Sequence, residues 1–223
     1  SSRKNYFSYE GTKNNPPDLI LRQGDAFEIK KIAKESNTDI QLNSSFPKST
    51  LSINDPKLTE ECKNCEEIDW KEKDIFYVIG VVSESIVKSL FFIQGPCLAA
   101  SYDHYDKIFQ ELKDHIANSS FKFKETKELG RINKIDHLGF TNLRIRAMVL
   151  LKNPYNIFDF CKIDSHKELS VFCLMTDSKY ASFEEGNRKK LEKFEDVTVV
   201  EKQIKSPVKP GKFLKCKFIQ FYK

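Results

Sequence analysis

The chain has 223 residues, of which 39% are hydrophobic and 31% charged. This length fits one large domain or two small ones, and the apolar share is enough for a core, which excludes a wholly disordered chain. The longest apolar runs are too short to span a bilayer and no leader segment opens the chain, so neither a membrane anchor nor secretion is indicated. The six cysteines are sparse for this length, which favours reduced thiols and a cytoplasmic protein.

The formal net charge is +5, but the charge is unevenly distributed. Residues 55–84 hold nine acidic and four basic residues, whereas residues 121–152 hold eight basic and three acidic ones. Residues 186–223 hold eleven basic and four acidic residues. Clustered lysines and arginines are typical of a surface that binds a polyanion such as nucleic acid, although a lysine-rich surface in contact with water alone would look the same.

The first part of the chain predicts a hairpin between two irregular segments. Residues 1–17 are polar and show little periodicity. Short strands are expected over Asp18–Arg22 and Ala26–Ile32, and the turn around Gly24 between them predicts a β-hairpin in which Asp25 serves the turn. Residues 33–60 are rich in Ser, Asn, Thr and Pro, which indicates a surface loop.

The middle of the chain predicts a second strand pair and then a helix. Asp74–Ser83 and Lys88–Gln94 are rich in β-branched and aromatic residues and are joined by a polar turn at Glu84 and Ser85. Residues 102–117 have helical apolar spacing. The apolar face of this helix comprises Tyr105, Ile108, Phe109, Leu112 and Ile116.

The second half of the chain predicts four more strands and one helix. The helix is expected over Ser182–Phe194, because Ser182 is a capping residue and Glu185 follows three positions later. Since helices and strands do not alternate strictly, the fold class is a mixed α+β arrangement, with a mixed β-sheet flanked by helices. The four strands are expected over Leu143–Leu151, Val171–Met175, Val197–Ile204 and Phe213–Tyr222.

Three charged residues are predicted to meet at the first hairpin. Glu28 and Lys30 are two apart on a strand, so their side chains leave the same face, while Phe27 and Ile29 point to the other face, into a core. If the chain turns at Gly24, Asp18 lies beside the Glu28 end of the partner strand. Two carboxylates and one ammonium group would then converge at one edge of the sheet.

Such a group of side chains fits a divalent cation. Mg²⁺ prefers one or two carboxylates together with waters and a substrate phosphate, and it stabilises charge on a phosphodiester during cleavage. A nearby lysine can orient the attacking water. The alternative is that Asp18 caps the strand and that Glu28 and Lys30 form a surface ion pair.

The spacing from Pro17-Asp18 to Glu28-Ile29-Lys30 matches the PD-(D/E)xK nuclease motif. With four further segments, the chain resembles the type II restriction endonucleases of the NgoPII-like family from about Tyr6 to its C-terminus. These segments are Asn14-Asn15-Pro16-Pro17-Asp18-Leu19-Ile20-Leu21, Leu42-Asn43-Ser44-Ser45-Phe46-Pro47-Lys48, Cys62-Lys63-Asn64-Cys65-Glu66 and Thr126-Lys127-Glu128-Leu129-Gly130-Arg131.

The resemblance implies a restriction-endonuclease-like core in one nuclease domain over residues 1–223, with a catalytic core at about 16–120 and a basic recognition portion at about 121–223. It implies a bacterial cytoplasmic homodimer that uses Mg²⁺ to cut both strands of duplex DNA at a short palindrome, leaving 5′-phosphate and 3′-hydroxyl ends, with a cognate DNA methyltransferase as its functional partner. Asp18 and Glu28 would hold the metal and Lys30 would position the water. Such enzymes usually carry a helix with an acidic residue before the first core strand. Residues 1–17 predict no helix and Glu10 lies in an irregular stretch, so either an upstream segment is absent from this chain or that element is dispensable.

Three groups of polar residues are candidates for contacting DNA. The alternative for each group is an ordinary surface that contacts only water. Arg131 and Arg144 are favoured as readers of guanine, because arginine presents two coplanar donors, and the lysines are favoured as phosphate contacts. The groups are Asn43, Ser44, Ser45 and Lys48 in one loop, Lys127, Arg131, Asn133 and Lys134 in a second basic loop, and Arg144 and Arg146 on one face of the next strand.

Two further readings stay open at this point. Cys62 and Cys65 have half the spacing of a zinc site, but no second pair exists, so ordinary thiols are favoured. A non-catalytic DNA-binding module, or a repair or structure-specific nuclease with the same motif, would share the basic second half of the chain.

Overall fold

The computed structural model describes residues 3–12, 15–33, 39–42, 46–124, 126, 128–164 and 166–223. Its strands are β1 (Phe7–Glu10), β2 (Leu19–Leu21), β3 (Ala26–Ala33), β4 (Ile40–Leu42), β5 (Thr50–Ser52), β6 (Glu72–Ser83), β7 (Ile86–Gln94), β8 (Gly130–Asn133), β9 (Asn142–Ile145), β10 (Val149–Leu151), β11 (Ser170–Thr176), β12 (Val197–Lys205) and β13 (Phe213–Tyr222). Its helices are α1 (Arg3–Tyr6), α2 (Glu60–Lys63), η1 (Gly95–Cys97), α3 (Tyr102–Ala117), α4 (Pro154–Ile157), α5 (Asp177–Ser182) and α6 (Glu185–Leu191).

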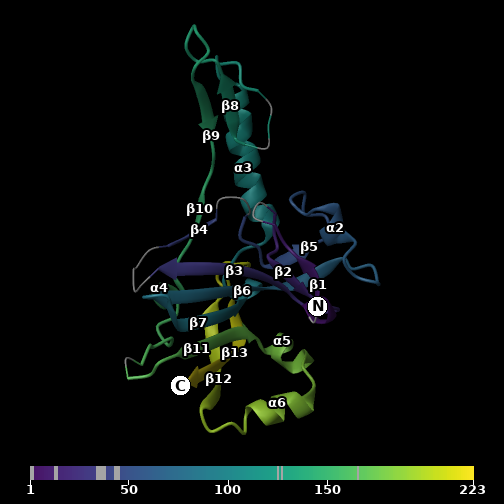
Figure 1. The fold of residues 1–223 in the computed structure, drawn as a ribbon, viewed down its shortest axis with the longest axis vertical. Helices are drawn as coiled ribbons and strands as arrows, with labels where there is room; N and C mark the ends of the chain where they lie inside the picture. Colours follow the sequence, from purple (N-terminus) through teal and green to yellow (C-terminus); the bar gives the residue numbers. More distant parts are fainter. Residues whose placement is uncertain are drawn as a thin grey trace.

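The centre of the molecule is one mixed sheet in the order β1-β2-β3-β6-β7-β11-β13-β12, with β5 paired to the start of β6 (Figure 1). The pairs β3–β6 and β7–β11 are parallel, and the other pairs are antiparallel. The sheet therefore confirms the expected fold class, and its edges are β1 and β12. Strands from both halves of the chain belong to it.

The sheet buries side chains on both faces. The larger core lies on the face of Ile79, Phe91 and Phe172, and it is covered by α2, α4 and the segments around β4 and β5. A smaller cluster of Phe76, Met175 and Tyr180 lies on the other face, where α5 and α6 cover the sheet. This double burial explains why the central strands are apolar at nearly every position.

The two predicted hairpins are confirmed. Leu19 pairs with Phe27 and Ile20 with Ala26 in β2–β3, and β6–β7 turns at Glu84 and Ser85. Both turn residues have positive φ, 50° and 68°, as a two-residue turn that follows the twist of its strands requires.

The first residues are more ordered than expected. They form α1 and β1, and Glu10 is the exposed last residue of β1, paired with Leu19. The prediction of an irregular segment over residues 1–17 is thus wrong for the described part. The polar sequence hid this strand, because β1 lies at the sheet edge and needs few apolar side chains.

Helix α3 occupies the predicted range and forms, with β8 and β9, an arm that projects from the sheet (Figure 1). At its base Phe109 packs on Phe46, with ring centroids 4.1 Å apart. On the same helix, Ile108 and Leu112 are 46% and 45% exposed. The expected apolar face therefore exists, but only part of it is covered.

The expected strand over Leu143–Leu151 is two strands. β9 pairs with β8 in the arm, whereas β10 pairs with β4 beside the sheet. Residues 146–148 connect the two, because one straight strand cannot serve partners in two separate parts of the molecule.

The expected helix over Ser182–Phe194 is shorter in the structure, where α6 spans Glu185–Leu191 and Ser182 belongs to the separate helix α5. Thr176 caps α5 by accepting a hydrogen bond from Lys179 N, and Ser182 ends that helix by donating to Lys179 O. Phe183 is extended, with ψ of 148°, and α6 begins two residues later. The prediction of Ser182 as an N-cap is therefore wrong.

The segment expected as a loop over residues 33–60 contains β4 and β5 in its described part. Each is three residues long, so periodicity could not reveal them. Among the described residues, no helix combines the length and the apolar character needed to cross a membrane.

Candidate active site

Asp18, Glu28 and Lys30 converge at the β2–β3 hairpin, as the sequence predicts. Lys30 Nζ donates to Glu28 Oε1 over 2.6 Å and lies 3.8 Å from Asp18 Oδ2. The side chains of Asp18, Glu28 and Lys30 are 37%, 9% and 23% exposed. The three groups form a partly buried cluster with two negative charges and one positive charge.

The hairpin backbone fixes Asp18. Its N–H donates to Phe27 O over 3.0 Å, and its Oδ2 accepts from Ile29 N over 2.6 Å. Gly11 N donates to Asp18 O over 2.7 Å, and a Cβ on Gly11 would lie 2.2 Å from Pro17 O. The glycine thus lets β1 approach the residue before the first carboxylate.

The predicted alternation along β3 is confirmed, but the face of Glu28, and not that of Ile29, packs on the larger core. The large core contains Ala26 and Ile32, which share the face of Glu28, while Ile29 is 47% exposed. Phe27 packs on the smaller cluster of the other face. The sequence could not decide between the faces, because this strand carries apolar residues on both.

Burial shifts the pKa of Glu28. Desolvation raises its pKa above the usual range, although the charge and hydrogen bond of Lys30 lower it. A buried carboxylate is costly without a cation beside it. Lys30 supplies one positive charge, and a metal ion would supply more.

Beneath Glu28 lies a buried polar group that the sequence did not reveal. Tyr77 pairs with Glu28 across β3–β6, and its hydroxyl accepts from Lys48 N over 2.7 Å and donates to Lys48 O over 3.1 Å. Lys48 Nζ is bonded to Asp55 Oδ2, and both side chains are only 3% exposed. Burial raises the pKa of Tyr77, so its hydroxyl stays protonated.

These contacts correct the expectation for Lys48. A phosphate contact needs an ammonium group that reaches solvent, whereas the Lys48 ammonium is enclosed and already paired. Lys48 instead has a structural role, since its backbone bonds to Tyr77, which pairs with Glu28.

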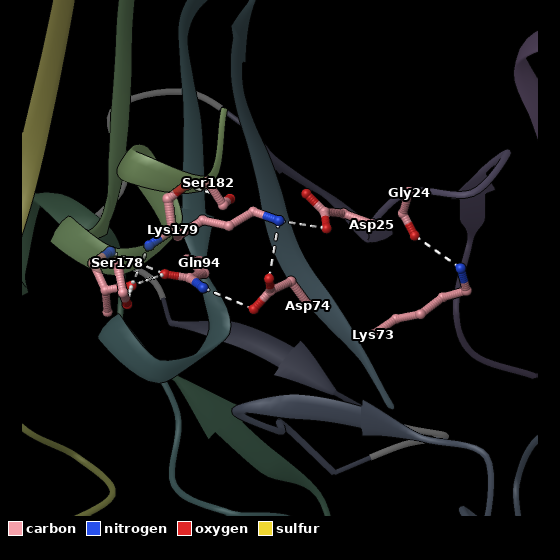
Figure 2. A network of polar contacts seen from close by, with 9 residues as sticks. Gly24, Asp25, Lys73, Asp74, Gln94, Ser178, Lys179 and Ser182 are labelled. Carbon is pink, nitrogen blue, oxygen red and sulfur yellow. Dashed lines mark hydrogen bonds and ion pairs between the residues drawn. The ribbon is translucent and has the colours of Figure 1, made fainter. Parts of the chain in front are cut away.

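A second network holds the hairpin turn from the other end. Figure 2 shows Lys179 of α5 between two carboxylates, at 2.6 Å from Asp25 Oδ1 and 2.9 Å from Asp74 Oδ2. Gln94 donates to Asp74 Oδ1 over 2.8 Å, and Lys73 donates to Gly24 O over 2.9 Å. Asp25 thus has a structural role at the turn, and it also ties β3 to α5.

The donor set of the cluster fits Mg²⁺. Among the described residues no group of three or more His, Cys, Asp or Glu side chains could hold a metal ion. Mg²⁺ does not require such a group, since it commonly takes one or two carboxylates and completes its shell with water and phosphate. Within the described chain, Asp18 Oδ1 and Glu28 Oε2 have no hydrogen-bond partner and can serve as ligands.

Apart from Lys48, the described candidates for DNA contact lie together on the arm. Arg131 and Asn133 belong to β8 and not to a loop, Lys134 follows with a positive φ of 57°, and Arg144 belongs to β9. Arg131 and Arg144 are paired residues across the hairpin. Arg146, just after β9, donates through Nε to Glu128 Oε1 over 2.6 Å.

The remaining predicted residues include four that the structure does not describe and two cysteines. Asn43, Ser44, Ser45 and Lys127 lie outside the described residues. Cys62 is buried in α2 and burial raises its pKa to about 12, while Cys65 accepts a hydrogen bond from Ser8 Oγ at 3.7 Å.

The large mixed sheet flanked by helices is consistent with a class of enzymes, those with a restriction-endonuclease-like core. The family model described as NgoPII restriction endonuclease matches residues 1–207. The type II restriction enzyme NgoPII of Neisseria gonorrhoeae is 38% identical over 221 residues, which cover 97% of this chain and 78% of that protein. The chain therefore belongs to the NgoPII restriction endonuclease family and is a site-specific endonuclease, a hydrolase. No solved structure matches it.

Proposed function

We propose that this endonuclease cleaves both strands of double-stranded DNA at a short palindromic site, in a Mg²⁺-dependent reaction that leaves 5′-phosphate and 3′-hydroxyl ends. The observation that supports this most directly is the cluster of Asp18, Glu28 and Lys30, with Lys30 Nζ 2.6 Å from Glu28 and 3.8 Å from Asp18. The family relation supports DNA as the substrate and a DNA methyltransferase as the functional partner that protects the host sites.

In this proposal Asp18 and Glu28 hold Mg²⁺ and Lys30 acts on the water. A bound Mg²⁺ stabilises charge on the phosphate and lowers the pKa of a coordinated water. Lys30 carries its ammonium beside both carboxylates, so it can orient the attacking water by hydrogen bonding and stabilise the developing negative charge. Asp18 is held by the Ile29 amide, which fixes one carboxylate before substrate arrives.

The arm supplies most of the proposed DNA contacts. Arg131, Lys134, Arg144 and Arg146 belong to a stretch with a positive balance of charge, which suits phosphate and base edges. Asn133 adds an amide. Asn43, Ser44, Ser45 and Lys127 remain proposed contacts, whereas Lys48 is no longer among them.

A palindrome presents two equivalent scissile phosphates, and one chain offers one Asp18–Glu28–Lys30 cluster. Twofold symmetry of the DNA is most simply matched by twofold symmetry of the protein. The enzyme therefore acts as a homodimer on its site.

The test is incubation of a long, unmodified duplex with the protein, with Mg²⁺ or with EDTA, followed by sequencing of the fragment ends. We expect discrete ends at one short palindrome, with 5′-phosphates, and only in the presence of Mg²⁺. Ends scattered over all sequences would indicate a repair or non-specific nuclease. Binding to the duplex without cleavage in any metal would indicate a non-catalytic module.

A further inference from the structure

The β8–β9 hairpin carries an arrangement that does not serve its own stability. Arg131 and Arg144 are directly opposed across the two strands. Like charges placed opposite each other destabilise a hairpin. This pair of arginines therefore needs another explanation, and the contacts of the two side chains provide one.

Three arginines of the arm, Arg131, Arg144 and Arg146, each donate a hydrogen bond from Nε to a neighbouring side chain. Arg144 donates from Nε to Glu128 Oε2 over 3.0 Å and from Nη2 to Glu128 Oε1. Arg146 donates from Nε to Glu128 Oε1 over 2.6 Å, and Arg131 from Nε to Asn133 Oδ1 over 2.9 Å. One carboxylate thus orients two guanidinium groups, and a neighbouring amide orients the third.

These contacts leave the outer edge of each guanidinium available. Arginine has five N–H donors in a planar fork, and the edge formed by Nη1 and Nη2 matches the O6 and N7 acceptors of guanine. In the described part of the chain, no hydrogen bond engages Nη1 of Arg131, Arg144 or Arg146. The side chains of Arg144 and Arg146 are 47% and 62% exposed, whereas Glu128 is only 15% exposed.

We propose that Glu128 is a positioning residue, which orients Arg144 and Arg146 so that their outer edges read guanines in a duplex groove. The inference rests on the proposed function for its partner, duplex DNA. Orientation before binding matters because a long side chain otherwise loses rotamer freedom when it binds, which weakens recognition. Glu128 is ionised at neutral pH, since the hydrogen bonds from Arg144 and Arg146 lower its pKa to about 2.

A purely electrostatic role of Glu128 would alter affinity in a binding experiment without altering discrimination between sequences. Removing a negative charge from a basic surface strengthens attraction to phosphate for every sequence. Removing a positioning residue weakens discrimination between sequences, although general attraction rises. The ratio of specific to non-specific binding therefore separates the two roles.

The experiment is a binding selection from a library of duplexes with a randomised central segment, in EDTA and again with Ca²⁺ in place of Mg²⁺. The proteins are the unaltered chain, Glu128→Ala, Glu128→Gln and the matched control Glu201→Ala. The change Glu201→Ala also removes one carboxylate from a basic region. Glu201 lies on β12, away from the arm, and pairs with Lys217 over 2.7 Å. Thermal melting of each variant shows that the fold is retained.

We expect the unaltered chain and Glu201→Ala to enrich the same short motif. Glu128→Ala should lose discrimination about tenfold or more at the guanines of that motif, while its affinity for random duplexes is equal or higher. Glu128→Gln should lie between them, because an amide oxygen can still accept one of the guanidinium bonds.

Two outcomes overturn the inference. One is an identical motif with identical discrimination for Glu128→Ala, and the other is no enrichment by the unaltered chain in either buffer. Cleavage plays no part in the selection. A chain that enriches a motif but cuts nothing in Mg²⁺ would contradict the proposed function and leave the role of Glu128 standing.

Discussion

At the scale of single residues, the burial of Glu28 distinguishes it from an ordinary ion-pair partner. Surface ion pairs keep both side chains in water and contribute little to stability. Glu28 is instead 7% exposed, with Tyr77 beside it and Lys30 as its cationic neighbour. Burying a carboxylate at this position costs stability, and such costs are characteristic of functional sites.

Replacing Asp18 or Glu28 with alanine should abolish cleavage, because each change removes a proposed ligand of Mg²⁺. Binding to the duplex should persist or become tighter, since a charge that repels phosphate is lost. Gel-shift and cleavage assays on one duplex measure both properties. Glu195→Ala, at an exposed carboxylate, should leave both unchanged. Substantial cleavage by Asp18→Ala in ordinary Mg²⁺ would end the assignment.

Lys48→Met should destabilise the fold by about 3–5 kcal/mol, because it leaves the enclosed Asp55 carboxylate without its partner. Urea unfolding measures this loss. Adding Asp55→Leu should recover part of it, since no buried charge then remains unpaired. A stable Lys48→Met protein with weaker DNA binding and a reduced salt slope would instead restore Lys48 as a phosphate contact.

At the scale of elements, the site depends on how closely β1, β2 and β3 approach one another. The strand β1 reaches the start of β2 through Gly11, whose amide bonds to Asp18 O. The turn at the far end is held by Asp25 and Lys179. The hairpin is thus fixed at both ends, which keeps the two carboxylates at one separation.

Gly11→Ala should impair cleavage more than it impairs folding. Its Cβ would meet a backbone oxygen at 2.2 Å, so Pro17 and the adjacent Asp18 must shift. The control is Gly186→Ala in α6, where a Cβ meets nothing within 4 Å. The higher helix propensity of alanine should raise the free energy of unfolding of this variant by about 0.5–1 kcal/mol. Cleavage rates and melting temperatures of both variants decide the matter. A Gly11→Ala protein with unaltered rates would show that β1 does not fix Asp18.

Local patterns were sufficient for much of this fold. The turns of both hairpins and the full length of α3 follow from residues that are neighbours in sequence. The burial of Lys48 depends on Tyr77, 29 residues away, and the contact of Glu128 with Arg144 spans 16 residues. Periodicity also identifies the apolar face of α3 without showing what covers it. Long-range partners of polar side chains were therefore the part that the sequence could not supply.

At the scale of the whole molecule, the two portions of the chain are joined. The portion at about 16–120 meets the portion at about 121–223 along the parallel pair β7–β11, and Lys179 of the second portion bonds to Asp25 and Asp74 of the first. The proposed catalytic cluster and the proposed reading arm therefore belong to one continuous framework. Within the described residues, α3 and residues 146–148 connect the arm to the sheet (Figure 1).

Two chains should bind each duplex that contains one cognate palindrome, because each scissile phosphate needs its own Asp18–Glu28–Lys30 cluster. Sedimentation of the complex in EDTA gives the protein-to-duplex ratio. A duplex of equal length without the site serves as the control. A ratio of one, together with symmetric cuts in both strands, would contradict the dimer.

The edge strands of the sheet bear on how two such chains can associate. An open sheet edge is a template for further strands and hence for aggregation. Here one edge is β1, only four residues long, and the other is β12, which carries the charged residues Glu201, Lys202 and Lys205. Short length and charge both discourage edge-to-edge growth. Addition of further strands at either edge is therefore disfavoured, which favours another surface for the pairing of two copies.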